Sequence, residues 1–138
     1  MNDDIRFTVT SRTGRQTAGS GSKWEPKMGY SRAVRSGNII AVSGTVGVNA
    51  DGKYPISVAE QTRRSLSIIQ AAIESLGGKI EHIIRTRMFV TDISKWEEVA
   101  SVHGEIFGEI RPATAIVEVA RLIDTEAKIE IEADVIVS

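Results

Sequence analysis

Charged and apolar side chains alternate along KIEIEADVIV, residues 128–137 of the chain. Successive side chains of a β-strand point to opposite faces, so this stretch predicts one apolar face and one face that carries Glu130, Glu132 and Asp134. Carboxylates on such a face can be solvated, can pair with a row of basic residues, or can contact a bound ligand. The spacing leaves these three roles open, and each role implies a different activity.

Composition excludes several kinds of chemistry. The chain has no cysteine, which rules out disulfides, thiol nucleophiles and thiolate metal sites and fits a cytoplasmic location. The two histidines, His82 and His103, are too few for a multi-histidine metal site, so we expect no bound metal. His103 falls on an apolar helical stripe, which is typical of a hydrogen-bonded core or interface histidine.

The charge balance argues against nucleic acid as a partner. Lys plus Arg is 17 and Asp plus Glu is 18, so the net charge of -1 gives weak attraction to a polyanion. Aromatic residues make up 5% of the chain, which leaves few rings for stacking bases. No apolar run reaches membrane-spanning length, so we expect no membrane partner either. A chain of 138 residues is the size of one domain.

Short β-branched stretches predict strands, and a polar stretch precedes them. Residues 1–27 are expected to form an N-terminal arm or loop, because positions 11–27 are rich in Ser, Thr and Gly, and the domain itself is expected at 28–138. Residues 38–48 predict a buried strand with a bend or bulge at Gly44 and Gly47. Residues 83–91 predict a strand whose core face carries Ile84, Met88 and Val90. The stretch 113–119 predicts a strand that is joined to the last strand by a hairpin.

Two capping boxes predict two helices. Ser57 and Glu60 open the first, which carries one apolar stripe and ends at Gly77-Gly78. Ser94 and Glu97 open the second. Two helices cover only one face of a sheet of this size, so the other face, which is half polar and half apolar, is expected to be buried against other copies of the chain.

Three motifs resemble the reactive-intermediate deaminases, the YjgF-like or Rid family. They are GYSRAVRSGNIIAVSG (29–44), RMFVTDI (87–93) and RPATAIVEVARL followed by KIEIEA (111–133). The resemblance implies an α+β, chorismate-mutase-like fold, a mixed sheet with two helices on one face. It also implies a homotrimer that binds a small-molecule metabolite in clefts between subunits. Well-known members hydrolyse 2-imino and enamine acids to a 2-keto acid and ammonia, without a cofactor.

The resemblance also implies which residues form the site. The carboxylate that holds and polarises the attacking water would be Glu130, the catalytic residue. The substrate-binding residues that match the family's motifs would be Tyr30, Ser43, Gly44 and Phe89.

The chain departs from the family at the arginine that clamps the substrate carboxylate. The pattern Pro-Ala-Arg reads Pro112-Ala113-Thr114 here, and a threonine offers one hydrogen bond without charge. Charge-assisted hydrogen bonds are worth roughly 1.5–3 kcal/mol each, so losing a bidentate pair costs on the order of 10² in affinity. We therefore expect an imine or enamine deaminase with poor activity on 2-imino acids.

Two other functions stay open on the sequence. The first is a non-catalytic trimer that binds a small metabolite or another protein. The second, a ribonuclease or translation inhibitor, is disfavoured by the near-neutral charge and the few aromatic residues.

Another cation could stand in for the missing arginine. Arg87 lies on the same kind of strand face as Glu130, whereas Arg111 precedes the strand of Thr114. We therefore take Arg87 as the stronger candidate for substrate binding. The alternative, which the sequence favours somewhat, is a charge ladder in which Arg85 and Arg87 pair across the strands with Glu118, Glu130 or Glu132.

Overall fold

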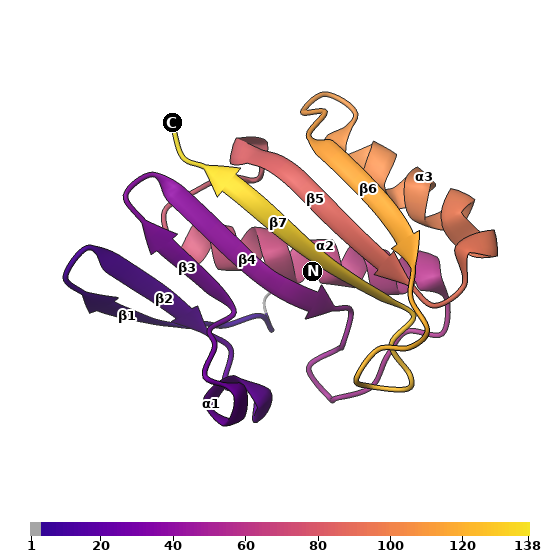
Figure 1. Cartoon of the computed structure of the whole chain (residues 1–138), viewed down its shortest axis with the longest axis horizontal. Coiled ribbons are helices and arrows are strands. Elements are labelled where there is room, and N and C mark those ends of the chain that lie inside the picture. The colour runs from indigo at the N-terminus through magenta and orange to yellow at the C-terminus, as the bar shows by residue number, and fades with distance from the viewer. Residues whose placement is uncertain (1–3) are drawn as a thin grey trace.

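The computed structural model describes residues 4–138, which form one seven-stranded mixed sheet with two long helices on one face (Figure 1). The α+β architecture expected from the sequence is confirmed. The elements, in chain order, are β1 (Thr8–Arg12), β2 (Arg15–Gly19), α1 (Trp24–Met28), β3 (Ala33–Ser36), β4 (Ile39–Val46), α2 (Val58–Ser75), β5 (Ile83–Val90), α3 (Trp96–Phe107), β6 (Ala113–Glu118) and β7 (Ile129–Ile136).

The strands lie in the order β1-β2-β3-β4-β7-β5-β6, so the last strand is central. Every pair is antiparallel except β5 with β6, which run parallel and are connected through α3. The predicted hairpin between β6 and β7 is therefore wrong. Strand β7 lies between β4 and β5, where its residues that face the helices are fully buried, whereas β6 forms the edge of the sheet.

Helix α2 lies behind the central strands and supplies most of the helical part of the core (Figure 1). Its predicted start is confirmed, because Ser57 Oγ accepts a hydrogen bond of 3.1 Å from the backbone N–H of Glu60. Its apolar stripe is confirmed as well. The members of the stripe are at most 3% exposed: Leu66, Ile69, Ile73 and Leu76.

Helix α3 begins differently from the prediction. The side chain of Asp92, not that of Ser94, accepts the capping bonds, from Ser94 N at 3.0 Å and from Ser94 Oγ at 2.6 Å. A short 3₁₀ turn over Ile93–Lys95 follows, and α3 starts at Trp96. An aspartate two positions ahead competes well for this N–H, because its short carboxylate closes a local turn.

The N-terminal stretch also differs from the expected loop or arm. Strands β1 and β2 form a hairpin that pairs with β3 and so extends the sheet, and α1 follows. All five residues of β1 are exposed, so this edge of the sheet is held by backbone pairing. Residues 1–3 lie outside the described part of the chain. A division of the chain at residue 28 stays a prediction.

The face of β5 was predicted with one error. Met88 and Val90 are buried as expected, but Ile83 is buried and Ile84 is 50% exposed. The register of β5 against β7 shifts between Ile83 and Arg85, which turns Ile84 away from the core. Arg85 and Arg87 lie on the face of the sheet that the helices leave uncovered.

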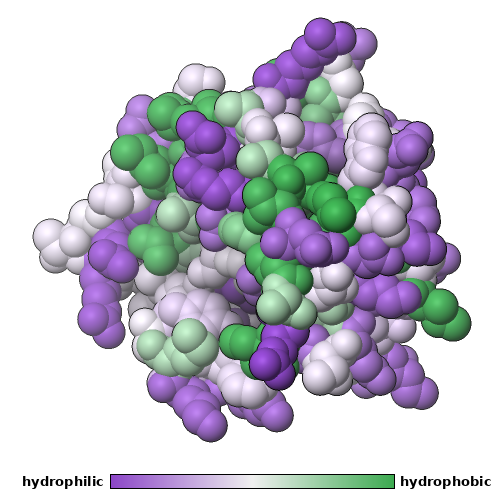
Figure 2. Space-filling view, turned by 45° about the vertical axis from the view of Figure 1, so that its right-hand side comes forward, coloured by the Kyte–Doolittle hydropathy of each residue, from purple (hydrophilic) through white to green (hydrophobic). Residues whose placement is uncertain are grey.

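Hydrophobic and hydrophilic residues are mixed on the surface, and Figure 2 shows hydrophobic residues gathered into small patches between hydrophilic ones. Several large apolar side chains are more than 40% exposed, among them Ile39, Val117, Ile123 and Ile136. Among residues 4–138, no helix is both long and apolar enough to cross a membrane.

Candidate functional site

Glu130 lies in a pocket of about 290 Å³ beside the point where β4 bulges. The register of β4 against β7 shifts between Val42 and Thr45, as the sequence predicted for the stretch that contains Gly44. The pocket brings together three of the residues that the family resemblance implied: Tyr30, Gly44 and Glu130.

The Glu130 carboxyl group is half-buried, and its surroundings change its acidity. Burial raises the pKa of Glu130, the positive charge of Arg32 lowers it, and the negative charge of Glu132 raises it, with a net increase above the ordinary value. A carboxylate with a raised pKa is a stronger base toward a water molecule than a carboxylate with the ordinary pKa.

The absence of a side chain at Gly44 leaves the space that the Glu130 carboxyl group occupies. A β-carbon at position 44 would lie 2.8 Å from Glu130 Cδ and about 3 Å from both carboxylate oxygens. The glycine is therefore required by close approach of a side chain to the strand, and any larger residue would displace the carboxylate.

Arg32 lies beside these residues and is not among the site residues predicted from the sequence. Arg32 Nη2 donates a 2.6 Å hydrogen bond to the carbonyl oxygen of Gly44, and the guanidinium carbon lies 5.5 Å from the centre of the Tyr30 ring. Its Nε is buried and has no partner among the described residues. A signal was present, because Arg32 follows Tyr30 by two positions within GYSR and so shares its side of an extended chain.

Two loops form another wall of the pocket through Tyr54 and Asp124. The Tyr54 hydroxyl donates a 3.0 Å hydrogen bond to Asp124 Oδ2, and burial together with this bond raises the pKa of Tyr54. The two residues are far apart in the sequence, so no local pattern could have paired them.

Ser43 and Phe89 lie near the pocket but do not line it. The Ser43 hydroxyl donates a 2.6 Å hydrogen bond to the carbonyl oxygen of Ser31, which ties β4 to the segment that carries Tyr30. Phe89 is the register partner of Glu130 across the β5–β7 pair. Their role in substrate binding stays a prediction.

Arg87 contacts the other acidic residues of β7. Its Nη1 donates to Glu132 Oε1 at 3.3 Å and to Asp134 Oδ2 at 3.1 Å, while Arg85 lies 3.7 Å from Asp134. The two arginines thus form a charge ladder as expected, with Glu132 as a predicted partner and Asp134 as one that was not predicted. These contacts point Arg87 away from the Glu130 pocket. The acidic face of β7 is thus divided between a pocket and a row of basic residues.

Thr114 ends a chain of hydrogen bonds beneath α3. Its hydroxyl lies 2.7 Å from that of the fully buried Thr86, which lies 2.9 Å from His103 Nε2. His103 is therefore a hydrogen-bonded, half-buried residue, as its position on the apolar stripe suggested. Burial lowers the pKa of His103. Thr114 does not line the Glu130 pocket of its own chain.

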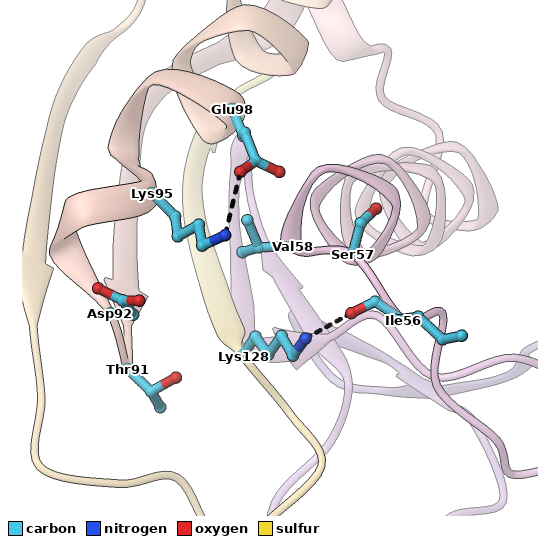
Figure 3. Close-up of a pocket in the computed structure, with 8 residues that line it drawn as sticks. All are labelled: Ile56, Ser57, Val58, Thr91, Asp92, Lys95, Glu98 and Lys128. Atoms are coloured by element: carbon cyan, nitrogen blue, oxygen red, sulfur yellow. Dashed lines mark hydrogen bonds and ion pairs between the residues drawn. The ribbon is translucent and has the colours of Figure 1, made fainter.

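A second cavity, of about 350 Å³, lies at the start of α2 and is lined by two lysines, Lys95 from the turn before α3 and Lys128 from the segment before β7 (Figure 3). Both cations already have partners, since Lys95 lies 3.8 Å from Glu98 and Lys128 Nζ donates to the carbonyl oxygen of Ile56. This cavity is therefore a weaker candidate than the Glu130 pocket. The described residues contain no group of three or more His, Cys, Asp or Glu side chains suited to a metal ion.

Known proteins resemble the chain over most of its length. The family model described as Endoribonuclease L-PSP matches residues 21–137. The 2-iminobutanoate/2-iminopropanoate deaminase of Escherichia coli K12 is 40% identical over 108 residues, which cover 75% of this chain and 84% of that protein.

Solved structures give the same result. Rv2704 of Mycobacterium tuberculosis, described as a member of the YjgF/YER057c/UK114 family, superposes with a TM-score of 0.83 at 45% identity, covering 89% of this chain and 99% of that one. The YjgF gene product of E. coli superposes with a TM-score of 0.73 at 39% identity, covering 78% and 87%. The matches in sequence and in fold agree, and the chain belongs to the YjgF-like, or Rid, family.

Proposed function

We propose that this protein hydrolyses imines or enamines to a carbonyl compound and ammonia, with Glu130 as the catalytic residue. The observation that carries the proposal is the Glu130 carboxyl group, which lies half-buried against Gly44 in the pocket and whose pKa is raised by burial. The 40% identity to a protein named 2-iminobutanoate/2-iminopropanoate deaminase supports the same reaction.

The reaction needs only water and proton transfer. A water molecule held by Glu130 adds to the carbon of the C=N bond, and Glu130 accepts a proton from it as the nitrogen becomes protonated. The resulting carbinolamine then breaks its C–N bond. Ammonia leaves, and the hydroxyl group loses its proton to give the C=O bond. The sum is one imine and one water converted to one carbonyl compound and one ammonia, with no oxidant or cofactor.

Activity on 2-imino acids is proposed to be lower than in relatives that have arginine where this chain has Thr114. Thr114 is an exposed residue of the edge strand whose hydroxyl is already bonded to Thr86, so it offers at most one uncharged contact to a carboxylate. We keep a homotrimer with inter-subunit clefts, and a cytoplasmic location, as part of the proposal. The position of Thr114 outside the Glu130 pocket of its own chain is compatible with a cleft shared between copies.

Ammonia release tests the reaction. Freshly generated 2-iminopropionate and a neutral imine are supplied separately to the wild type, to Glu130→Gln and to Glu130→Ala. We expect the wild type to release ammonia faster than buffer from at least one substrate, and both variants to lose this activity while they retain the wild-type melting temperature within a few degrees.

The alternative function predicts a different result. A wild type that releases no ammonia above buffer from either substrate, yet binds a small metabolite, would be a binding module. Release that persists in Glu130→Gln and Glu130→Ala would mean that another group handles the water.

A further inference from the structure

The pocket that holds Glu130 also holds a cation that the fold leaves largely unused. Arg32 lines the pocket, and its guanidinium carries five N–H donors. Among the described residues, its side chain makes one hydrogen bond, from Nη2 to the carbonyl oxygen of Gly44. The remaining donors include the buried Nε, for which no partner is present in residues 4–138. Buried donors without a partner are rare, and each needs a reason.

Other arginines of the chain have carboxylate partners. Arg64 lies 2.6 Å from Asp4, Arg63 lies 2.9 Å from Glu105, and Arg87 lies 3.1 Å from Asp134. In the described part of the chain, Arg32 forms no direct ion pair, although the Glu130 carboxylate is close enough for its charge to act on it. The two groups of opposite charge thus share one pocket without neutralising each other.

The guanidinium is also held in place before any ligand arrives. The Gly44 carbonyl fixes one end, and the face of the Tyr30 ring lies under the planar group at a distance suited to a cation–π contact. Gly44 also lies against the Glu130 carboxyl group. Arg32 and Glu130 therefore both contact Gly44, and both line the same pocket. A preorganised cation of this kind costs a ligand little entropy to use.

We propose that Arg32 binds a carboxylate of the pocket's ligand, so that the carbon next to this carboxylate faces the Glu130 side of Gly44. The inference rests on the proposed function of the pocket and names its substrate class, small imines or enamines with an anionic group. The cation comes from the segment before β3 rather than from the position of Thr114. Because one N–H is already bonded to Gly44, Arg32 offers a weaker grip than an arginine whose whole fork is free.

A matched pair of stable ligands tests this assignment without requiring turnover. Pyruvate and pyruvamide have nearly the same shape and differ in charge, and their dissociation constants can be measured by titrating the ¹⁵N-labelled full-length protein. The variants are Arg32→Gln and, as a control that removes the same charge far from the pocket, Arg63→Gln. Arg63 lies on α2 and is paired with Glu105 at the surface.

We expect the wild type to bind pyruvate about 10-fold or more tightly than pyruvamide, with shifts at Tyr30 and Gly44. Arg32→Gln should remove this preference by weakening pyruvate alone, and Arg63→Gln should leave it intact. A wild type without the preference, or an Arg32→Gln variant that keeps it or weakens both ligands equally, would overturn the assignment. Loss of the preference in both variants would show a general charge effect and would overturn it too.

The result is separable from that of the ammonia assay. If no imine is hydrolysed but the preference for pyruvate depends on Arg32, the proposed reaction fails and the carboxylate site stands. If a neutral imine is hydrolysed through Glu130 but pyruvate is not preferred, the reaction stands and the role of Arg32 fails.

Discussion

The carboxyl group of Glu130 lies against the α-carbon of Gly44, so close that a β-carbon there would come within 2.8 Å of Glu130 Cδ. This contact joins strand β4 to strand β7 at the bulge. It places a half-buried carboxylate beside the backbone of a neighbouring strand, where a small ligand can reach both.

Gly44→Ala tests whether this contact matters for activity. The added methyl group meets only the end of a movable side chain, so we expect Glu130 to be displaced and the rate to fall by about 10²-fold, with little change in melting temperature. Gly47→Ala is the matched control, because its β-carbon would lie 2.1 Å from the backbone oxygen of Gln61 and should destabilise the fold. A Gly44→Ala variant with the wild-type rate would contradict the proposed site.

The pH dependence of kcat/KM reports on Glu130. The proposed base must be ionised, so the rate should fall as the pH drops through the pKa of Glu130, which burial raises above the ordinary 4.5. Since the positive charge of Arg32 lowers this pKa, Arg32→Gln should move the acid limb to higher pH. Rates with a neutral imine measure the shift free of substrate binding by Arg32. An acid limb that moves to lower pH in Arg32→Gln would be inconsistent with the structure.

His103 should make the stability of the fold depend on pH. Burial lowers the pKa of His103 in the folded chain below its unfolded value of about 6.5. The unfolded chain then binds more protons between these two values. The contribution of neutral His103 is therefore complete above about pH 6.5 and is lost as the pH falls below it. Urea unfolding of wild type and His103→Gln between pH 8 and pH 5 should show a smaller loss in the variant; equal losses would argue against a titrating His103.

Thr114→Arg tests the proposal that Thr114 stands where active relatives carry an arginine that clamps the substrate carboxylate. The site is exposed on an edge strand and accepts a long side chain, at a stability cost of about 1 kcal/mol for the lost Thr86 hydrogen bond. We expect turnover of 2-iminopropionate to rise by up to about 10²-fold, while turnover of a neutral imine stays unchanged. An unchanged rate with 2-iminopropionate would mean that other positions of the site also differ from active relatives.

Arg87→Ala separates the charge ladder from substrate binding. Arg87 and its partners Glu132 and Asp134 are each about 40% exposed, so removing the pair should cost about 1 kcal/mol or less in the free energy of unfolding. In the ladder interpretation, the Michaelis constant for 2-iminopropionate is unchanged. An increase of about 10-fold, with no increase for a neutral imine, would instead return Arg87 to the list of substrate ligands.

Local patterns in the sequence determined the elements whose faces follow a regular period. The alternation of β7, the capping serine of α2 and its apolar stripe were all predicted, because the backbone geometry alone decides which side chains share a face. The motifs shared with the Rid family indicated Glu130, Gly44 and Tyr30 in the same way, as short segments of fixed spacing. The hairpin β1–β2 was not predicted, because β1 is exposed and is held by backbone pairing, which imposes no pattern on side chains.

Only the tertiary structure decided which segments meet. The insertion of β7 between β4 and β5 brings Glu130 to Gly44 and Arg32, from opposite ends of the chain. The pairing of β7 with β5 also places Arg87 where it donates hydrogen bonds to Glu132 and Asp134. The physical reason is that strand order and register depend on how the whole apolar surface is buried, and a contact between distant residues leaves no trace in the spacing of either one.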